Sequence, residues 1–289
     1  MPELPEVESM KLQLAKFLKG HKITSVVVNN RTTFQGDEKN IIGGKVIGTR
    51  RFGKVSVIDL DNGYSILTHV KLTGQYIYRG ANLPNPRSLS PKVTGGIPGP
   101  HTLVIFKLDN KGILYYNDVR RFGWIKITKS EEVKTNSFIG KLGPEPPVVQ
   151  DFTGQKLTLE LFKQILSKTS RPIKIVLMDQ EKMGGVGNIY ANDALWLAGI
   201  DPRRKAKSIE GKAAEELYKA VLTVLKAGLK YGGASELAFV TPDGEEGEYQ
   251  NHTLAYGHEG ELCSRCKKAK FEKYFLGGRG TYVCPVCQK

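Results

Sequence analysis

The residues of this chain with the clearest chemical purpose are four cysteines close to its C-terminal end. They form two Cys-x-x-Cys pairs, Cys263 with Cys266 and Cys284 with Cys287. Each pair places two thiolates within reach of one ion, and two pairs complete the closed tetrahedral shell of a structural zinc site. That shell leaves no open position for a substrate, so we expect one Zn²⁺ that stabilises a small hairpin. The alternative is two reactive or redox-active cysteine pairs.

The segment between the two cysteine pairs is rich in basic side chains, and it includes the sequence Gly277-Gly278-Arg279-Gly280. A basic run of this kind is often only a solvated surface. The glycine-rich turn, however, would hold one guanidinium on a rigid loop, and a guanidinium forms two parallel hydrogen bonds with a phosphate group. We therefore expect Arg279 to bind phosphate.

The charge of the whole chain points to the same class of partner. Its 289 residues contain 43 lysines and arginines against 29 aspartates and glutamates, a formal net charge of +14. Such an excess favours a polyanion, and nucleic acid is preferred over a membrane surface because no lysine-rich amphipathic helix adjoins an apolar anchor. No apolar run approaches the roughly 18 residues of a membrane helix, and MPELPEVES lacks the features of a signal peptide. We expect a cytoplasmic protein that does not bind membranes.

The N-terminal half of the sequence predicts one helix followed by a β-rich domain. Residues 5–18 have helical periodicity, with Val7, Met10 and Leu14 near one face. Beyond them, short β-branched and aromatic runs recur at a spacing of about ten residues between turn sequences, which is typical of an antiparallel sandwich or barrel. The runs predicted as strands are 23–28, 45–51, 55–60, 65–70, 75–78, 102–108, 113–118 and 123–127.

The C-terminal half of the sequence predicts helices and then the metal module. Pro- and Gly-rich composition predicts a loop at 80–100 and an interdomain linker at 141–154. The helical segments that follow are 157–168, 172–183, 188–198 and 208–230.

Several motifs occur together in this chain and extend over essentially all of it. In this order and spacing they closely resemble the formamidopyrimidine-DNA glycosylase (Fpg) family. The resemblance implies a bifunctional glycosylase and AP lyase of base excision repair that acts as a monomer on damaged double-stranded DNA. The motifs are MPELPEVE at the start, RRFGK at 50–54, THVKLTG at 68–74, YNDVRRFG at 116–123, RPIKIVLMDQ at 171–180, GVGNIYANDALW at 185–196 and GGRGTYVCPVCQK at the end.

The resemblance assigns the covalent chemistry to the start of the chain. Removal of Met1 would leave Pro2 as the N-terminal residue, and an α-amine with a pKa of about 8 keeps a useful neutral fraction near neutral pH. Its attack on the sugar C1′ would give a Schiff-base (iminium) intermediate that permits strand cleavage by β,δ-elimination. Glu3 matches the family's acid/base and Glu6 a second glutamate, although both could simply stabilise the helix dipole.

Three further residues match family positions near the damaged nucleotide. Lys54 matches a lysine that contacts phosphate beside the lesion, and we group it with the catalytic residues. Lys174 matches a lysine that reaches toward the damaged nucleotide. Asp179 matches a carboxylate near the site, but a role on a helix surface is nearly as good an interpretation.

The remaining matches concern the grip on DNA. His69, Asn188 and Arg279 match phosphate clamps that pinch the backbone on both sides of an extruded nucleotide. Asn188 lies in Gly187-Asn188-Ile189-Tyr190-Ala191, which resembles the turn of the family's helix–two-turn–helix (H2TH) motif, where backbone amides contact phosphate.

Extrusion of a nucleotide leaves a hole in the duplex, which the family fills with three side chains, usually Met, Arg and Phe. Arg120 and Phe122 occupy the matching places for the Arg and the Phe, and Phe122 would wedge between base pairs unless it is a core aromatic of a strand. Leu72 stands where the family has Met, and it is less adaptable. Residues 239–249 correspond to the loop that covers the flipped base.

The implied fold is α+β. An N-terminal helix and a two-layered antiparallel β-sandwich form a catalytic domain over 1–130, followed by a linker at 131–155. A helical H2TH domain covers 156–232, a lesion-covering loop and connection 233–257, and a zinc-finger β-hairpin 258–289.

Substrate class separates two members of the superfamily. The resemblance implies excision of oxidised purines, namely 8-oxoguanine and formamidopyrimidines. An endonuclease VIII-like enzyme would prefer oxidised pyrimidines, but its start usually resembles MPEGPE, whereas this chain has MPELPE. A third hypothesis is a DNA-binding module without chemistry, which the presence of Pro2, Glu3 and Lys54 together disfavours. On DNA, a bacterial protein of this kind would be associated with the nucleoid.

Overall fold

The computed structural model describes residues 1–80, 83, 89–150 and 153–289. Parts of the predicted 80–100 loop and of the predicted linker, namely 81–82, 84–88 and 151–152, lie outside the described residues. The chain divides into two compact units, each built from two stretches of sequence. The first unit is Met1–Gly140 with Leu229–Gln250, and the second is Lys141–Gly228 with Asn251–Lys289.

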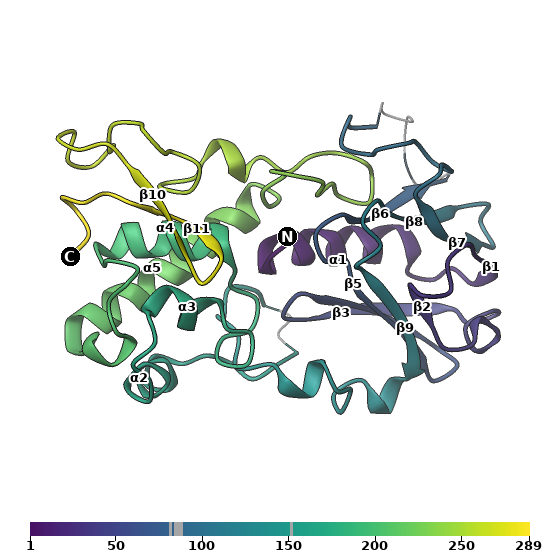
Figure 1. The fold of residues 1–289 in the computed structure, drawn as a ribbon. Coiled ribbons are helices and arrows are strands. Elements are labelled where there is room, and N and C mark those ends of the chain that lie inside the picture. Colours follow the sequence, from purple (N-terminus) through teal and green to yellow (C-terminus); the bar gives the residue numbers. More distant parts are fainter. Residues whose placement is uncertain (81–82, 84–88, 151–152) are drawn as a thin grey trace. The chain divides into compact units, whose positions relative to one another are not determined.

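The first unit begins with the predicted helix, α1 (Leu4–Leu18). Glu3 and Glu6 form a reciprocal capping box at its start, so that each carboxylate serves a backbone N–H that no helical carbonyl can reach. Pro5 lies in the first turn, where a missing N–H costs nothing. The apolar face is fully buried, and Figure 1 shows α1 running among the strands of this unit.

The strands of the first unit form two sheets, and all the runs predicted as strands are strands in the structure. One sheet has the order β1-β7-β8-β6, formed by β1 (Ile23–Val28), β7 (Thr102–Leu108), β8 (Ile113–Asp118) and β6 (Gly74–Arg79). The other has the order β2-β9-β5-β4-β3, formed by β2 (Phe34–Gln35), β9 (Trp124–Lys129), β5 (Tyr64–His69), β4 (Val55–Leu60) and β3 (Val46–Phe52).

The two sheets form the expected β-sandwich, and its pairing is antiparallel with one exception. The short strand β2, which the sequence did not predict, pairs with β9 in parallel. One hydrophobic core contains side chains from α1 and from both sheets, for example Leu14, Ile58 and Val104. This shared core fixes α1, and with it the start of the chain, against the sandwich.

In the part of the chain that the structure describes, the second unit contains four α-helices, as predicted: α2 (Leu159–Ser167), α3 (Ile173–Met178), α4 (Asn188–Ala198) and α5 (Gly211–Lys230), whose last two residues belong to the first unit. The helix predicted at 172–183 ends earlier, at Met178, because the side chain of Gln180 organises a turn. Its Nε2 donates to the carbonyls of Met178 at 2.9 Å and Val186 at 2.7 Å, and its Oε1 accepts from the amide of Gly185 at 3.0 Å.

The predicted hairpin at the end of the chain consists of β10 (Glu272–Leu276) and β11 (Arg279–Val283), joined by two glycines with positive φ. It lies against α4 (Figure 1). Within the described residues, no helix combines the length and apolarity needed to cross a membrane. The short 3-10 helices are η1 (Glu38–Asn40), η2 (Ser130–Glu132), η3 (Ile139–Lys141), η4 (Ala206–Ser208) and η5 (Tyr249–Asn251).

Candidate functional site

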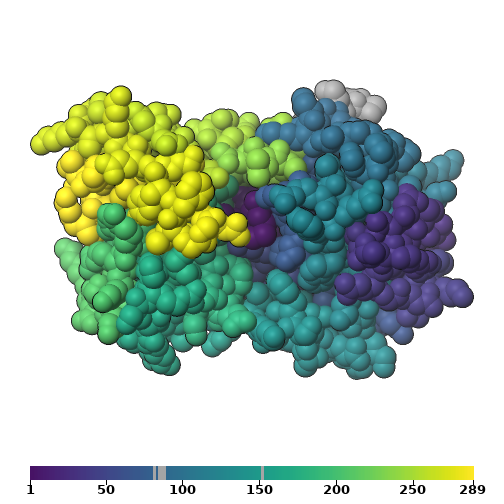
Figure 2. Space-filling view, in the orientation of Figure 1, coloured from purple at the N-terminus to yellow at the C-terminus, as the bar shows by residue number. Residues whose placement is uncertain are grey.

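The start of the chain is held in place by two buried carboxylates. Glu3 is 2% exposed and Glu6 is 1% exposed. Glu6 Oε2 accepts from the backbone N–H of Glu3 at 2.7 Å, and Glu6 Oε1 accepts from the N–H of Ala234 at 2.7 Å. Pro2 is therefore attached to a fixed helix start, while Met1 is 44% exposed and the first residues reach the surface in Figure 2 (dark purple).

The contact with Ala234 brings a distant part of the chain to the same place. Gly233, immediately before it, has a φ of +90°. A Cβ at this position would lie 2.8 Å from Glu6 Cγ, so both conformation and space require glycine. Glu6 thus joins the chain start to the segment that leads into the predicted covering loop.

Lys54 lies in the turn between β3 and β4, after Gly53, which has a φ of +54°. The turn is tied to α1 by a buried charge network. Arg51 donates through one guanidinium nitrogen to the carbonyl of Gly53 at 2.8 Å and through Nε to Glu8 at 2.8 Å. Lys11 lies 2.9 Å from the same carboxylate, and these three charged side chains are at most 6% exposed. The network fixes the turn with Lys54 relative to α1, the helix that follows Pro2.

Removing the negative charge of Glu8 from this network is expected to destabilise the folded protein. In the variant Glu8→Gln, two buried cations lose a negative charge that they contact directly, which lowers the free energy of unfolding by about 3–5 kcal/mol. Denaturant unfolding followed by circular dichroism measures this. The matched control is Glu216→Gln, because Glu216 pairs with Lys219 at 3.3 Å on an exposed helix surface. Equal midpoints for Glu8→Gln and the parent would contradict a stabilising network.

His69, at the end of β5, is placed to act as a neutral hydrogen-bond donor. Burial, together with the ammonium groups of Lys71 and Lys54, lowers the pKa of His69 to about 3. Its Nδ1 faces the backbone N–H of Lys71 at 3.0 Å, so Nδ1 is the acceptor and Nε2 carries the proton. Phe138 and Trp124 contact the ring, with centroids 5.3 and 6.0 Å away.

The low pKa of His69 also has a consequence for stability. An unfolded histidine takes up a proton near its ordinary pKa of 6.5, whereas the folded one does so only near 3. The unfolded state therefore binds more protons in this interval, and the contribution of His69 to stability falls as the pH drops from 6.5 toward 3.

The three predicted void-filling residues lie on two neighbouring loops that one buried carboxylate holds together. Asp118 accepts from the Thr73 hydroxyl at 2.5 Å, from the Arg120 N–H at 3.2 Å and from the Gly123 N–H at 2.8 Å. Leu72 lies beside Thr73 and is half-buried. Phe122 is 59% exposed, so its interpretation as a core aromatic is wrong.

Arg120 and Phe122 interact with each other on their loop. The Arg120 guanidinium lies 4.9 Å from the centroid of the Phe122 ring, within the range of a cation–π contact. Arg121 between them has a φ of +57°, which a non-glycine residue adopts only at a cost. The loop therefore holds the exposed Arg120 and Phe122 side chains in a defined arrangement.

In the second unit, Asn188 is the first residue of α4 and follows the turn that Gln180 organises. Its side-chain amide therefore lies at the N-terminal, positive end of the helix dipole, a position suited to phosphate. Asn192, one turn along, binds the hairpin: its Oδ1 accepts from the Tyr282 N–H at 2.9 Å. The helix and the hairpin are thus fixed together.

Lys174 is fully buried, and its ammonium is directed at the hairpin. It donates to the carbonyl of Gly280 at 2.7 Å and to the hydroxyl of Thr281 at 2.8 Å. These residues follow Arg279, whose side chain is exposed at the turn. The described contacts of Lys174 are therefore structural, and its predicted catalytic role stays a prediction. Asp179 forms a 2.7 Å ion pair with Arg171.

The four cysteines form one compact cluster. All four Sγ atoms lie within 4.8 Å of one another, with 3.8 Å between those of Cys263 and Cys287 and 3.7 Å between those of Cys266 and Cys284. These separations exceed a disulfide bond of about 2.05 Å and match the roughly 3.8 Å between thiolates around a tetrahedral Zn²⁺. The cluster can hold a metal ion with all four thiolates.

Comparison with known proteins places this geometry in a family. The model of the formamidopyrimidine-DNA glycosylase N-terminal domain matches residues 1–125, and the model of the formamidopyrimidine-DNA glycosylase H2TH domain matches residues 142–239. The chain belongs to the formamidopyrimidine-DNA glycosylase family. The H2TH match includes the Gln180 turn and the start of α4, so the motif proposed from Gly187-Asn188-Ile189-Tyr190-Ala191 is confirmed.

Relatives in the family match the chain over its full length. The formamidopyrimidine-DNA glycosylases of Lactococcus lactis and Listeria monocytogenes are 33% and 35% identical to it, and each alignment covers 100% of both chains. A crystal structure of the Lactococcus lactis Fpg with abasic-site DNA has a TM-score of 0.84 at 31% identity over 99% of each chain. The Thermus thermophilus MutM (Fpg) structure has a TM-score of 0.84, also at 31% identity, over 99% of this chain and 98% of that one.

Several positioning residues were missed at the level of sequence. Asp118 stands inside the quoted YNDVRRFG motif, and its place between a strand and a loop was the available signal. Glu8 and Arg51 also lie in quoted motifs, but only the buried ion pair between them shows their purpose. Lys92 and Glu246 carry no sequence signal, because their contact joins loops 154 residues apart.

Proposed function

We propose that this protein is a bifunctional DNA glycosylase and AP lyase that excises oxidised purines from duplex DNA in base excision repair. The observation that carries the proposal is the fixed start of α1, where a proline that can become N-terminal adjoins a buried glutamate. The relatives named above support it, because they are formamidopyrimidine-DNA glycosylases and the solved structures include complexes of the Lactococcus lactis protein with damaged DNA.

The covalent step uses the nitrogen of Pro2 after loss of Met1. Its lone pair forms a bond to C1′ of the damaged nucleotide while the bond from C1′ to the base breaks, and the base leaves with a proton. The product is an aminal, and its C1′–O4′ bond then breaks while O4′ takes up a proton, which opens the sugar ring and leaves an iminium between C1′ and the Pro2 nitrogen. This iminium acidifies the C2′ proton, whose removal expels the 3′ phosphate and then, by δ-elimination, the 5′ phosphate. Glu3, whose carboxylate adjoins the nucleophile in sequence, moves the protons at the sugar.

The DNA is held by groups that bind phosphate and by groups that fill the hole. Lys54 and His69 contact phosphates on the first unit, and Asn188 and Arg279 do so on the second. Arg120 and Phe122, with Leu72 in place of the usual methionine, occupy the space that the extruded nucleotide leaves. A structural Zn²⁺ held by the four cysteines supplies no chemistry and stiffens the hairpin that carries Arg279.

Substrate preference distinguishes the proposed function from that of an endonuclease VIII-like enzyme. The purified protein, with an intact C-terminal hairpin, is incubated with one duplex that contains 8-oxoguanine opposite cytosine and with another that contains an oxidised pyrimidine. We expect faster strand cleavage of the 8-oxoguanine duplex. Faster cleavage of the pyrimidine duplex would favour an endonuclease VIII-like enzyme, and binding without any cleavage would favour a module without chemistry.

The grip on phosphates predicts a specific pattern of salt dependence. The logarithm of the binding constant should fall linearly with the logarithm of salt concentration. Arg279→Ala removes a cation and should reduce this slope by about one. His69→Gln should weaken binding without changing the slope, because its imidazole is neutral at pH 7. Fluorescence anisotropy from low to moderate salt measures both, and a parent slope near zero would contradict the phosphate clamps.

We also propose a monomer in the cytoplasm, associated with the bacterial nucleoid when bound to DNA. A single active site and one DNA duplex require no second copy. Sedimentation of the free protein and of its DNA complex tests the stoichiometry, and two protein chains per lesion would contradict it.

A further inference from the structure

The predicted covering loop, residues 239–249, is part of a longer segment, 233–250, that is anchored at many points to the rest of the first unit. This segment contacts α1, β6 and the residues that follow position 88. The Tyr78 N–H donates to the carbonyl of Pro242 at 2.6 Å, and the Asp243 side chain accepts from Gln13 at 3.1 Å. Most of the segment is buried, but Glu236 and Leu237 are exposed, Leu237 by 60%, as are Glu246 and Glu248. Glu236 and Leu237, directly before the predicted loop, form what we call the exposed corner.

The exposed corner lies close to the catalytic start of the chain. It begins two residues after Ala234, whose N–H donates to Glu6, and Glu6 in turn accepts from the N–H of Glu3. Of the exposed positions in this segment, Glu236 and Leu237 are the nearest in sequence to the contact between Ala234 and Glu6. The position of Glu236 and Leu237 should therefore affect how a base is received.

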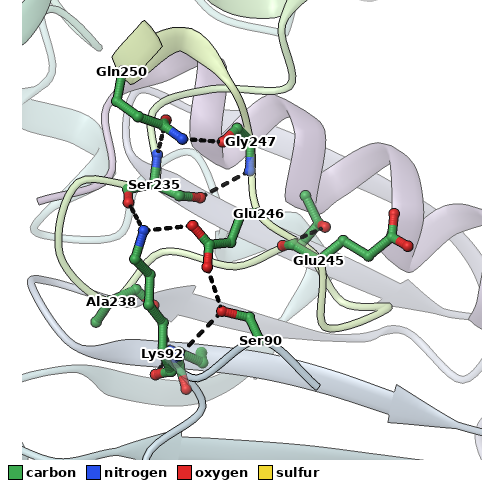
Figure 3. A network of polar contacts seen from close by, with 10 residues as sticks. Ser90, Lys92, Ser235, Ala238, Glu245, Glu246, Gly247 and Gln250 are labelled. Atoms are coloured by element: carbon green, nitrogen blue, oxygen red, sulfur yellow. Dashed lines mark hydrogen bonds and ion pairs between the residues drawn. The ribbon is translucent and has the colours of Figure 1, made fainter. Parts of the chain in front are cut away.

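One lysine on a different segment holds both sides of the loop. The ammonium of Lys92 donates to the backbone carbonyl of Ser235, directly before the exposed corner, and to the carboxylate of Glu246 at 2.5 Å (Figure 3). Ser90 supports the same carboxylate through its hydroxyl at 2.6 Å. The Lys92 ammonium and the Ser90 hydroxyl hold the pKa of the Glu246 carboxyl below its usual value.

The carbonyl on the other side of the exposed corner is held as well. Buried Gln75 donates through Nε2 to the carbonyl of Ala238 and to that of Lys92, the latter at 2.9 Å. Across the loop, the Gly247 N–H donates to the Ser235 hydroxyl at 2.8 Å, and Gln250 accepts from the Ser235 N–H at 2.8 Å (Figure 3). The exposed corner is thus fixed at both of its ends.

We propose that Lys92 is a positioning residue that fixes the exposed corner Glu236–Leu237 before DNA binds, and that this preorganisation is needed for excision of a base but not for cleavage at a site that has none. The proposal rests on the proposed function, because a covering loop matters only to an enzyme that receives a base. A fixed corner loses less conformational freedom when the base arrives, and misplacement of such contacts lowers the rate of the chemical step.

The test compares two substrates and three variants of the full-length protein. Lys92→Met removes the ammonium and Glu246→Gln removes its charged partner. Lys45→Met is the control, because Lys45 is exposed directly before β3, whereas the turn with Lys54 follows the other end of that strand. Single-turnover cleavage is measured on a duplex with 8-oxoguanine and on the same duplex with an abasic site. Hydrogen exchange of the free protein measures how fast the backbone amides of Ser235 and Gly247 exchange, and thus how firmly the loop is held.

The expected result is selective. Lys92→Met should slow cleavage of the 8-oxoguanine duplex by roughly ten- to hundredfold, leave cleavage of the abasic duplex unchanged, and speed exchange of the loop amides. Glu246→Gln should also slow cleavage of the 8-oxoguanine duplex. The double variant should slow it by less than the product of the two single effects, because both variants break the same contact. Equal loss on both substrates, or unchanged exchange and unchanged rates, would overturn the proposal. Absence of cleavage by the parent protein would instead reject the proposed function. In that case, the exchange rates of the loop amides in Lys92→Met and in the parent would decide whether Lys92 fixes the loop.

Discussion

A protein whose chain is extended before Pro2, so that the proline nitrogen becomes an amide, is expected to lose strand cleavage of both 8-oxoguanine and abasic duplexes by at least about a thousandfold. An amide nitrogen has no available lone pair, so it cannot form the iminium on which elimination depends. The extension projects from Met1, which is 44% exposed, and leaves the buried network of Glu3 and Glu6 intact. Gel analysis of cleaved duplexes measures the loss.

The control for this prediction is the same extension placed after Lys289. It should leave cleavage unchanged, and both proteins should bind damaged duplex with similar affinity, since the phosphate-binding groups are untouched. Full cleavage by the N-terminally extended protein, with the extension verified by mass spectrometry after the reaction, would exclude Pro2 as the nucleophile.

The second large effect is expected from loss of the metal. Cys284→Ala removes one of four thiolates from a site whose sulfur atoms already lie at distances suited to one Zn²⁺. The β10–β11 hairpin is too small to keep its shape without the ion. Affinity for damaged duplex should fall by about 2–4 kcal/mol, or roughly 30- to 1000-fold, because Arg279 is no longer held in place.

Metal content and binding are measured on the same sample. The near-ultraviolet circular dichroism of the first unit should remain, because the cysteines belong entirely to the second unit. The control is Ser264→Ala, which changes a side chain between two ligands without removing a thiolate. Unchanged affinity of Cys284→Ala after verified loss of zinc would contradict a role of the metal in DNA binding.

Much of the fold could be predicted from sequence because its signals are local. The strands follow β-branched runs of adequate length between turns, and the start of α4 at Asn188 follows Gly187, which takes the extended backbone of a helix N-cap. The strand β2 was missed because two residues give no periodicity. The helix predicted over 172–183 was too long because Gln180, five residues from its partner Gly185, replaces helical hydrogen bonds with its own.

Only part of the candidate site could be predicted from the residues themselves. The cysteines are a local pattern, so their cluster was foreseen and is confirmed. The roles of Pro2, Glu3 and Lys54 came from family resemblance, since composition alone gives a terminal proline no purpose. Positioning contacts such as Glu8 with Arg51 and Lys92 with Glu246 depend on tertiary structure, because each joins residues far apart in the chain.

The central claim is that the amine of Pro2 attacks the sugar, and covalent trapping tests it most directly. The protein is incubated with a duplex that contains 8-oxoguanine opposite cytosine in the presence of borohydride, which reduces an iminium to a stable amine. Peptide mapping then locates the attached nucleotide. We predict an adduct on residue 2 in a chain that has lost Met1. An adduct on a lysine such as Lys54, or cleavage without any adduct, would contradict the mechanism.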